Sequence, residues 1–140
     1  MAKSVREIMS QDCQCIQETA TLTEAAKRLA ELNVGAMPIC GQDDRLKGML
    51  TDRDIVVKAL AQGKDPATTT AGELAQGTPV WIAADAPVDE ALKTMAGRQI
   101  RRLPVIQDHK LVGIVAIADI ARDADDTVVG KVVEAISSGP

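Results

Sequence analysis

The chain has 140 residues, of which 46% are hydrophobic, so it can bury about two-thirds of its unfolded surface in a core. Its net charge of -4 and its pI near 5.0 argue against a nucleic-acid partner, because no excess of Lys and Arg is available to neutralise phosphates. With no Phe, no Tyr and a single Trp, the chain cannot form an aromatic platform for single-stranded bases.

No stretch approaches the roughly 20 consecutive apolar residues that a membrane span needs. The opening residues Met1-Ala2-Lys3-Ser4 are not followed by an apolar run that could serve as a signal peptide. The sequence therefore predicts a cytoplasmic protein with no membrane partner.

The elements of the first half begin with Ser4-x-x-Glu7, a capping box that opens a short helix. A short strand is predicted over residues 13–17, and Thr21-x-x-Glu24 caps the main helix. Strands 36–40 and 46–50 then form a hairpin, and a closing helix follows. The main helix has an apolar stripe at helical spacing, formed by Leu22, Ala25, Ala26, Leu29 and Leu32.

The second half repeats this order. Thr70-x-x-Glu73 opens a short helix, a strand covers residues 80–83, and Pro87 lies near the start of the main helix. Strands 102–106 and 111–115 form the second hairpin and precede the second closing helix. Residues 62–69 form the linker between the halves. A last helix over residues 126–137 is predicted to pack against the body or a second subunit.

The two halves are copies of one unit, because pairs of similar residues recur at an offset of 66 positions, from Pro38 to Pro104 for example. After a one-residue deletion near residue 43 the offset is 65, which relates Gly48 to Gly113. The sequence thus predicts an α+β fold of two β-α-β-β-α repeats, residues 1–65 and residues 66–140.

The stretch from Gly48 to Asp54 is a strand that leads directly into a helix. Thr51 is placed as the N-cap, and Asp54 follows three residues later. Free amide groups and the helix dipole also make such a helix start a natural anion site. The pair can therefore be interpreted as a capping box or as part of a phosphate and ribose site.

The doubled order of elements and Gly48-x-x-Thr51-x-x-Asp54 resemble a tandem pair of CBS domains, the regulatory unit called a Bateman module. The resemblance implies two repeats packed sheet to sheet about a pseudo-two-fold axis, clefts that hold adenosine nucleotides, and disc-like homodimers. It implies that Asp54 binds ribose hydroxyls and Thr51 contacts phosphate. It places adenine against residues of the first repeat, namely Ile16, Ala36, Met37 and Pro38.

The second repeat departs from this pattern, because Ala116 stands where the hydroxyl residue belongs, although Asp119 remains. We therefore expect one nucleotide site per chain, for AMP, ADP or ATP. Arg101 and Arg102 precede the second proline and are candidate phosphate contacts, or else ordinary surface charges. Arg53 is a weaker candidate for the same role.

The cysteines lack the usual spacing of a zinc site, and the single histidine, His109, falls in a predicted turn, so no metal site is predicted. Cys15 and Cys40 lie on strands expected to be neighbours. A disulfide between them is geometrically feasible, whereas a reducing cytoplasm favours two buried thiols.

The sequence contains no catalytic constellation and predicts no enzyme and no required cofactor. The leading hypothesis is a regulatory module that binds an adenine nucleotide between its repeats and signals to an unidentified protein. The alternative is a structural or protein–protein interaction dimer that needs no ligand, with a Cys pair that could respond to redox conditions.

Overall fold

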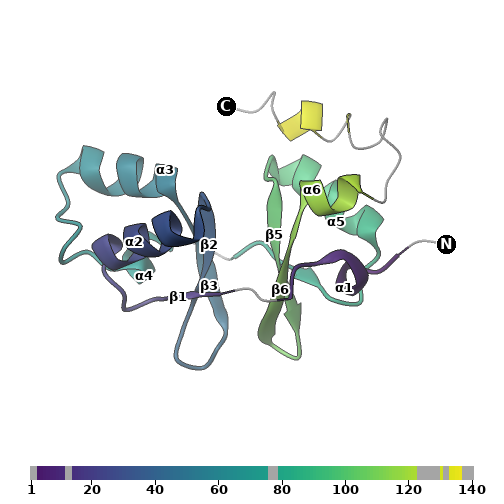
Figure 1. Cartoon of the computed structure of the whole chain (residues 1–140), viewed down its shortest axis with the longest axis horizontal. Helices are drawn as coiled ribbons and strands as arrows, with labels where there is room; N and C mark the ends of the chain where they lie inside the picture. The colour runs from purple at the N-terminus through teal and green to yellow at the C-terminus, as the bar shows by residue number, and fades with distance from the viewer. Residues whose placement is uncertain (1–2, 12–13, 76–78, 123–129, 131–132, 137–140) are drawn as a thin grey trace. The chain divides into compact units, whose positions relative to one another are not determined.

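The computed structural model of the chain describes residues 3–11, 14–75, 79–122, 130 and 133–136. The chain divides into two compact units, shown in Figure 1. One unit spans Gln14–Pro79, and the other combines Met1–Cys13 with Val80–Pro140.

The first unit contains a three-stranded sheet with the order β1-β2-β3. β2 runs parallel to β1 and antiparallel to β3, so the sheet is mixed. The elements in chain order are β1 (Ile16–Gln17), α2 (Leu22–Leu32), β2 (Ala36–Cys40), β3 (Leu46–Thr51), α3 (Asp52–Asp54), a π-helical segment (Ile55–Ala59), a 3-10 turn (Leu60–Gln62) and α4 (Ala71–Leu74).

The second unit has the same topology, with the sheet order β4-β5-β6. Its elements are α1 (Val5–Ile8), β4 (Ile82–Ala83), α5 (Val88–Arg98), β5 (Arg102–Gln107), β6 (Lys110–Ala116) and α6 (Ile117–Ala121). The predicted α+β class and the repeated β-α-β-β-α order are thereby confirmed.

Two predicted strands are shorter than expected. β1 and β4 each contain two residues, because each pairs with only the last part of the central strand of its sheet. Most of the predicted helix over residues 126–137 lies outside the described residues, and the described positions 130 and 133–136 are helical.

Each compact unit contains the leading helical turn of the other repeat. The Val5 amide at the start of α1 donates to the Ala86 carbonyl at 2.9 Å, and Val5 is buried in the core of the second unit. In the same way α4 buries Ala71 and Leu74 in the core of the first unit. A helix of four residues is not stable alone, so its place is decided by the core that accepts its apolar side chains. The compact units are therefore divided at 13/14 and 79/80, and the repeat bounds drawn from the sequence, residues 1–65 and 66–140, stay a prediction.

The main helix of the first unit, α2, begins and ends at recognisable caps. The Thr21 hydroxyl accepts from the Glu24 amide at 3.2 Å, and Asn33 ends the helix in the left-handed conformation. Leu22, Ala25 and Leu29 are buried as predicted, but Ala26 is exposed and Leu32 is 40% exposed. The buried stripe is therefore smaller than its sequence pattern, because Ala26 lies to one side of the buried positions and Leu32 is the last residue of the helix.

Within the part of the chain that the structure describes, no helix is long and apolar enough to cross a membrane. The cytoplasmic location stays a prediction.

Candidate functional site

The candidate site begins where β3 of the first unit ends. Thr51 is the last residue of β3, pairs with Ala36 at the start of β2, and serves as the N-cap of the following helix. Its hydroxyl oxygen accepts a hydrogen bond from the Asp54 amide at 3.0 Å. The Asp54 carboxylate in turn accepts from the Thr51 amide at 3.0 Å. The sequence motif therefore forms a complete capping box.

The carboxylate of Asp54 retains room for a ligand. One of its oxygens accepts from the Thr51 amide, and the other lies 3.3 Å from Lys58 Nζ. The Asp54 side chain is 21% exposed. Because a carboxylate has about four acceptor positions, two remain that could accept from ribose hydroxyls. Lys58 was missed from the sequence, although its i,i+4 spacing from Asp54 is a recognised ion-pair spacing.

The amides at this helix start are all engaged within the protein. The Asp52 amide donates to the Gly35 carbonyl at 2.9 Å, and the Arg53 amide donates to the Asp52 carboxylate at 2.7 Å. The Asp54 amide donates to Thr51. The free amides that the sequence predicted as an anion site therefore already have partners, and Asp52, which the sequence did not single out, provides one of them.

The residues predicted to contact adenine lie at different places along β2. Ala36 is half-buried beside Thr51, while the side chain of Met37 packs in the core of the first unit and Pro38 is fully buried. Ile16 is buried and pairs with Ile39, three residues along β2 from Ala36, or about 10 Å at strand spacing. The structure therefore brings Ala36, Thr51 and Asp54 together and places Ile16 farther along the sheet.

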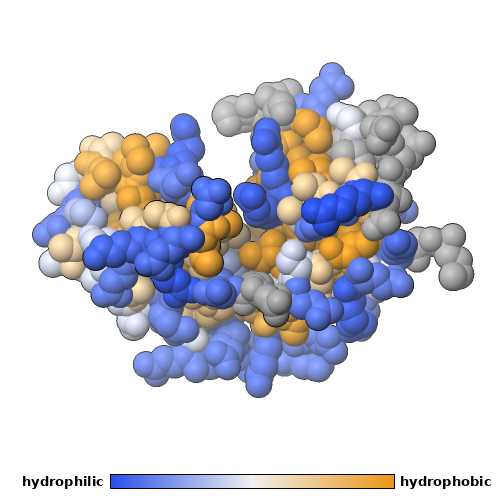
Figure 2. Space-filling model, viewed as in Figure 1, coloured by the Kyte–Doolittle hydropathy of each residue, from blue (hydrophilic) through white to orange (hydrophobic). Residues whose placement is uncertain are grey.

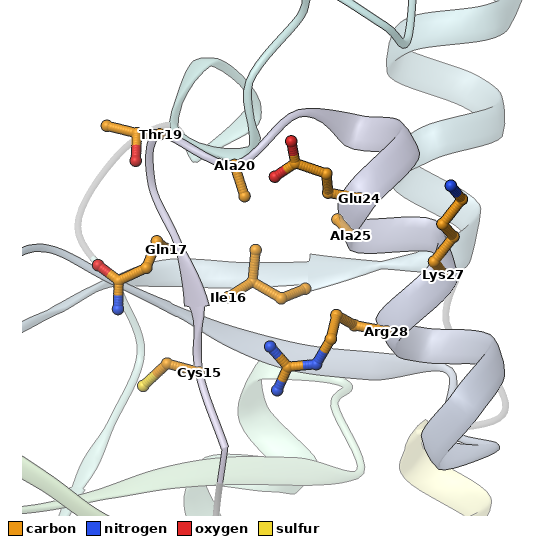
Figure 3. A pocket seen from close by; sticks show the side chains of 9 residues that line it. All are labelled: Cys15, Ile16, Gln17, Thr19, Ala20, Glu24, Ala25, Lys27 and Arg28. Carbon is orange, nitrogen blue, oxygen red and sulfur yellow. The ribbon is translucent and has the colours of Figure 1, made fainter.

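A pocket of about 480 Å³ lies between β1, the turn that follows it and α2 (Figure 3). Of the residues predicted to contact the nucleotide, Ile16 alone lines it. In Figure 3 the Arg28 guanidinium extends from α2 toward β1, and Arg28 donates to the Gln14 side chain. The lining residues are Cys15, Ile16, Gln17, Thr19, Ala20, Glu24, Ala25, Lys27 and Arg28.

The corresponding turn of the second repeat forms only half of a capping box. Asp119 accepts from the Ala116 amide at 2.8 Å, but Ala116 has no hydroxyl to accept from the Asp119 amide. The Ile117 amide donates to the Arg101 carbonyl at 2.9 Å, as the Asp52 amide does to Gly35. The loss of one cap that the sequence predicted is therefore visible in the structure.

The candidate arginines differ in their placement. Arg53 is exposed in the first turn after β3. Arg101 and Arg102 are exposed at the start of β5, in the other compact unit from Thr51 and Asp54. Arg122, which the sequence did not single out, lies 3.4 Å from Asp119.

Cys15 and Cys40 are joined by a disulfide, with 5.7 Å between their Cα atoms. The bond connects the residue before β1 to the last residue of β2, next to the pocket that Cys15 lines. Cys40 is buried, and Cys15 is half-buried. Of the two alternatives drawn from the sequence, the structure contains the disulfide.

Potential metal ligands do not cluster among the described residues: no group of three or more His, Cys, Asp or Glu side chains could hold an ion there. His109 lies in the turn between β5 and β6 with a φ of 67°. Cys13 lies outside the described residues.

The family comparison agrees with the repeat. A model of the CBS domain matches residues 5–60 and again residues 71–126. The chain belongs to the CBS domain family. The predicted resemblance is thereby confirmed, and CBS domain pairs are typically non-catalytic regulatory modules.

Individual CBS proteins extend this result. The chain is 51% identical over 135 residues to hypoxic response protein 1 of Mycobacterium tuberculosis, covering 96% of this chain and 94% of that protein. A crystal structure of hypoxic response protein I with two coordinated zinc ions has a TM-score of 0.83 and 53% identity, covering 88% of this chain and 100% of that one.

Two further solved structures are more distant. The CBS domain pair of protein MJ0100, in complex with 5′-methylthioadenosine and S-adenosyl-L-methionine, has a TM-score of 0.76 and 32% identity, covering 87% of this chain and 95% of that one. The hexameric CBS-CP12 protein from bloom-forming cyanobacteria has a TM-score of 0.76 and 30% identity, covering 91% of this chain and 71% of that one.

Proposed function

We propose that this CBS domain pair is a regulatory module that binds an adenosine-containing ligand on its first repeat. Asp54 accepts hydrogen bonds from the ribose hydroxyls, and Ala36, at the start of β2 opposite Thr51, leaves space beside the ribose. The observation that carries the proposal is the Asp54 carboxylate, held in place by the Thr51 amide and Lys58 yet 21% exposed.

The second repeat differs from the first in ways that favour ligand binding at the first repeat. Its turn retains Asp119 but lacks the hydroxyl that completes the capping box. The side chain of Asp119 is 12% exposed and is paired with Arg122 at 3.4 Å. The Asp119 carboxylate is therefore less accessible to a ribose than the Asp54 carboxylate. We expect one ligand per chain.

Two relatives with bound ligands bear on the chemical class of the proposed ligand. The MJ0100 domain pair, 32% identical to this chain, was crystallised with two adenosyl compounds. The more similar hypoxic response protein I was crystallised with zinc. The described residues of this chain contain no group of ligands for such an ion, so the adenosyl compounds are the better guide.

A ligand regulates such a module only if it binds two arrangements of the protein with different affinity. We propose that the bound ligand changes the affinity of this chain for an unidentified downstream protein. The π-helical segment after Asp54 is a candidate for the element that responds, because π-helical turns are frequent at functional sites and Lys58 within it contacts Asp54.

A homodimer is part of the proposal. The helix that follows β3 exposes large apolar side chains, with Val56 56%, Val57 42% and Leu60 51% exposed. Figure 2 shows this apolar surface over the helical segment labelled α3 in Figure 1. Val56 and Leu60 are four residues apart and share one face. Exposed apolar surface of this kind marks interaction sites. The CBS-CP12 relative is described as hexameric, so a CBS protein of this fold can form an oligomer.

The second candidate function is an interaction dimer that needs no ligand. It is favoured by the same capping box, because Thr51 and Asp54 already satisfy each other without a ligand. In that case the disulfide between Cys15 and Cys40 is the feature that could respond to the surroundings.

A thermal-shift titration distinguishes the two candidates. We expect 5′-methylthioadenosine, S-adenosylmethionine or adenosine to raise the melting temperature, since a ligand at a hundred times its Kd stabilises by about 2.7 kcal/mol. The shift should disappear in Asp54→Ala and remain in the matched variant Asp119→Ala, which loses the equivalent amide acceptor in the second repeat. If none of these compounds nor AMP, ADP or ATP shifts the parent protein, the interaction dimer is the better account.

A further inference from the structure

The Asp52 carboxylate lies among the groups that a bound phosphate would need. Its Oδ1 accepts from the Arg53 amide at 2.7 Å. Its Oδ2 lies on the Gly35 side, 3.4 Å from the position that a Cβ on Gly35 would take. The side chain therefore lies between Gly35, the residue before β2, and the first turn of the helix. Asp52 is nevertheless exposed to solvent.

The geometry points to Asp52 as a specificity-determining residue: it excludes ligands with a 5′-phosphate and selects adenosine compounds whose 5′ group is neutral or positively charged. This inference rests on the proposed function, because it concerns the ligand of the same turn. It replaces the AMP, ADP or ATP expected from the sequence by another ligand class.

Hydrogen bonding is the first part of the argument. A phosphate binds a helix start by accepting from its free amides. Here the amides of Asp52, Arg53 and Asp54 donate to Gly35, to Asp52 and to Thr51 respectively. A phosphate would have to displace the Asp52 carboxylate to reach the Arg53 amide, and the exchange gains no hydrogen bond.

Charge is the second part. Two carboxylates, Asp52 and Asp54, lie within one helical turn. In the described part of the chain Lys58 pairs with Asp54, and no cation pairs with Asp52. A phosphate beside Asp52 would therefore be repelled by a carboxylate that forms no ion pair, with the exposed Arg53 as the neighbouring cation, whereas a sulfonium at the 5′ position would be attracted to that carboxylate.

The second repeat shows that the fold does not require this carboxylate. Ile117 occupies the position that corresponds to Asp52 at the offset of 65 residues, and its amide makes the equivalent hydrogen bond, to Arg101, at 2.9 Å. The turn from strand to helix is therefore made with an apolar side chain as well. Asp52 is free to serve ligand selection.

The experiment measures the binding of 5′-methylthioadenosine and of AMP to the full chain by calorimetry. We expect the parent to bind 5′-methylthioadenosine more tightly than AMP. Asp52→Asn removes the charge, and Asp52→Ala also frees the Arg53 amide. The affinity for AMP should rise about fivefold in Asp52→Asn and further in Asp52→Ala, with that for 5′-methylthioadenosine unchanged.

The matched control is Asp89→Asn, which removes an exposed carboxylate from the first turn of α5. It should leave both affinities as they are in the parent. Equal affinity of the parent for the two compounds, or an equal change for both in the Asp52 variants, overturns the role of Asp52 while the proposed function stands. Failure of every adenosine compound to bind overturns the proposed function itself. Since two Asp52 variants are measured, poor folding of one leaves the other to decide.

Discussion

Thr51 and Asp54 exchange two hydrogen bonds of 3.0 Å, each side chain accepting from the backbone amide of the other residue. The exchange makes the end of β3 and the start of the helix one rigid turn. Because the same two residues are the candidate ligand contacts, substitutions there change stability and binding together. Stability must therefore be measured separately from binding.

The first prediction concerns this cap. Thr51→Ala should lower the free energy of unfolding by about 1 kcal/mol, since the Asp54 amide loses its acceptor. The reverse change, Ala116→Thr, should stabilise the second repeat by up to about 1 kcal/mol, because Asp119 is already placed to complete the box. Urea unfolding of both variants measures the difference. Unchanged midpoints in both would contradict the capping role.

The second prediction concerns the disulfide. Reduction of the Cys15–Cys40 bond should lower the free energy of unfolding by about 3 kcal/mol, because the bond closes a loop with a sequence separation of 25 residues. Urea unfolding with and without reductant measures the loss. The variant Cys15→Ser cannot form the bond, so its midpoint should not respond to reductant. Because the chain has three cysteines, a parent protein in which thiol titration finds three free thiols instead of one would refute the disulfide.

The third prediction compares two glycines. A Cβ at Gly113 would lie 2.6 Å from the Ser10 carbonyl oxygen, where the segment after α1 passes the strand. Gly113→Ala should therefore destabilise by about 1–3 kcal/mol. Gly97 lies inside α5 with nothing within 4 Å of an added Cβ, so Gly97→Ala should stabilise by about 0.5–1 kcal/mol. The melting temperatures of the two variants should shift in opposite directions, and a Gly113→Ala protein that melts at or above the temperature of the parent would contradict the close contact.

The fourth prediction concerns pH. The Thr70 amide donates to Glu73 at 2.6 Å and the Thr70 hydroxyl at 3.1 Å, and these bonds hold the pKa of Glu73 below its ordinary value of 4.5. A carboxylate with a lowered folded pKa stabilises the protein fully above its unfolded pKa. That contribution is lost as the pH falls through the folded value.

The measurement is the urea midpoint of Glu73→Gln against the parent as a function of pH. The variant should be less stable at neutral pH, and the difference should shrink as the pH falls below 4.5. Glu90→Gln, an exposed carboxylate in the first turn of α5, is the control for the loss of one surface charge. A difference that is constant with pH would show that the Glu73 carboxylate contributes nothing through its charge.

The fifth prediction concerns the exposed apolar helix. Val56→Glu combined with Leu60→Glu should shift the protein from dimer to monomer, because two charges on the apolar face cannot be buried against a second copy. Light scattering coupled to gel filtration measures the mass. Ala61→Glu adds a charge to the same helix at an exposed position and should leave the dimer intact. A parent protein that is monomeric at all concentrations would refute the homodimer.

Much of the fold follows from local patterns. Thr21 and Glu24 predicted the start of α2, and the motif at Thr51 and Asp54 predicted the turn from strand to helix, because capping depends on residues three positions apart. The extent of the apolar stripe was wrong at Ala26 and Leu32, since a helical pattern does not reveal which of its apolar positions the rest of the unit covers. The pocket beside α2 was not predicted, although all its lining residues fall within residues 15–28, because the space between β1, the turn and α2 depends on how these elements pack.

The sequence by itself determined the doubled β-α-β-β-α order and the missing hydroxyl at Ala116, because repeats and single substitutions can be compared position by position. Only the tertiary structure decided that α1 packs with the second unit and α4 with the first, since a four-residue helix has no preference until a core accepts it. The tertiary structure also decided that Asp52 accepts from the Arg53 amide. The orientation of one exposed carboxylate depends on the backbone that surrounds it, and no sequence pattern records that orientation.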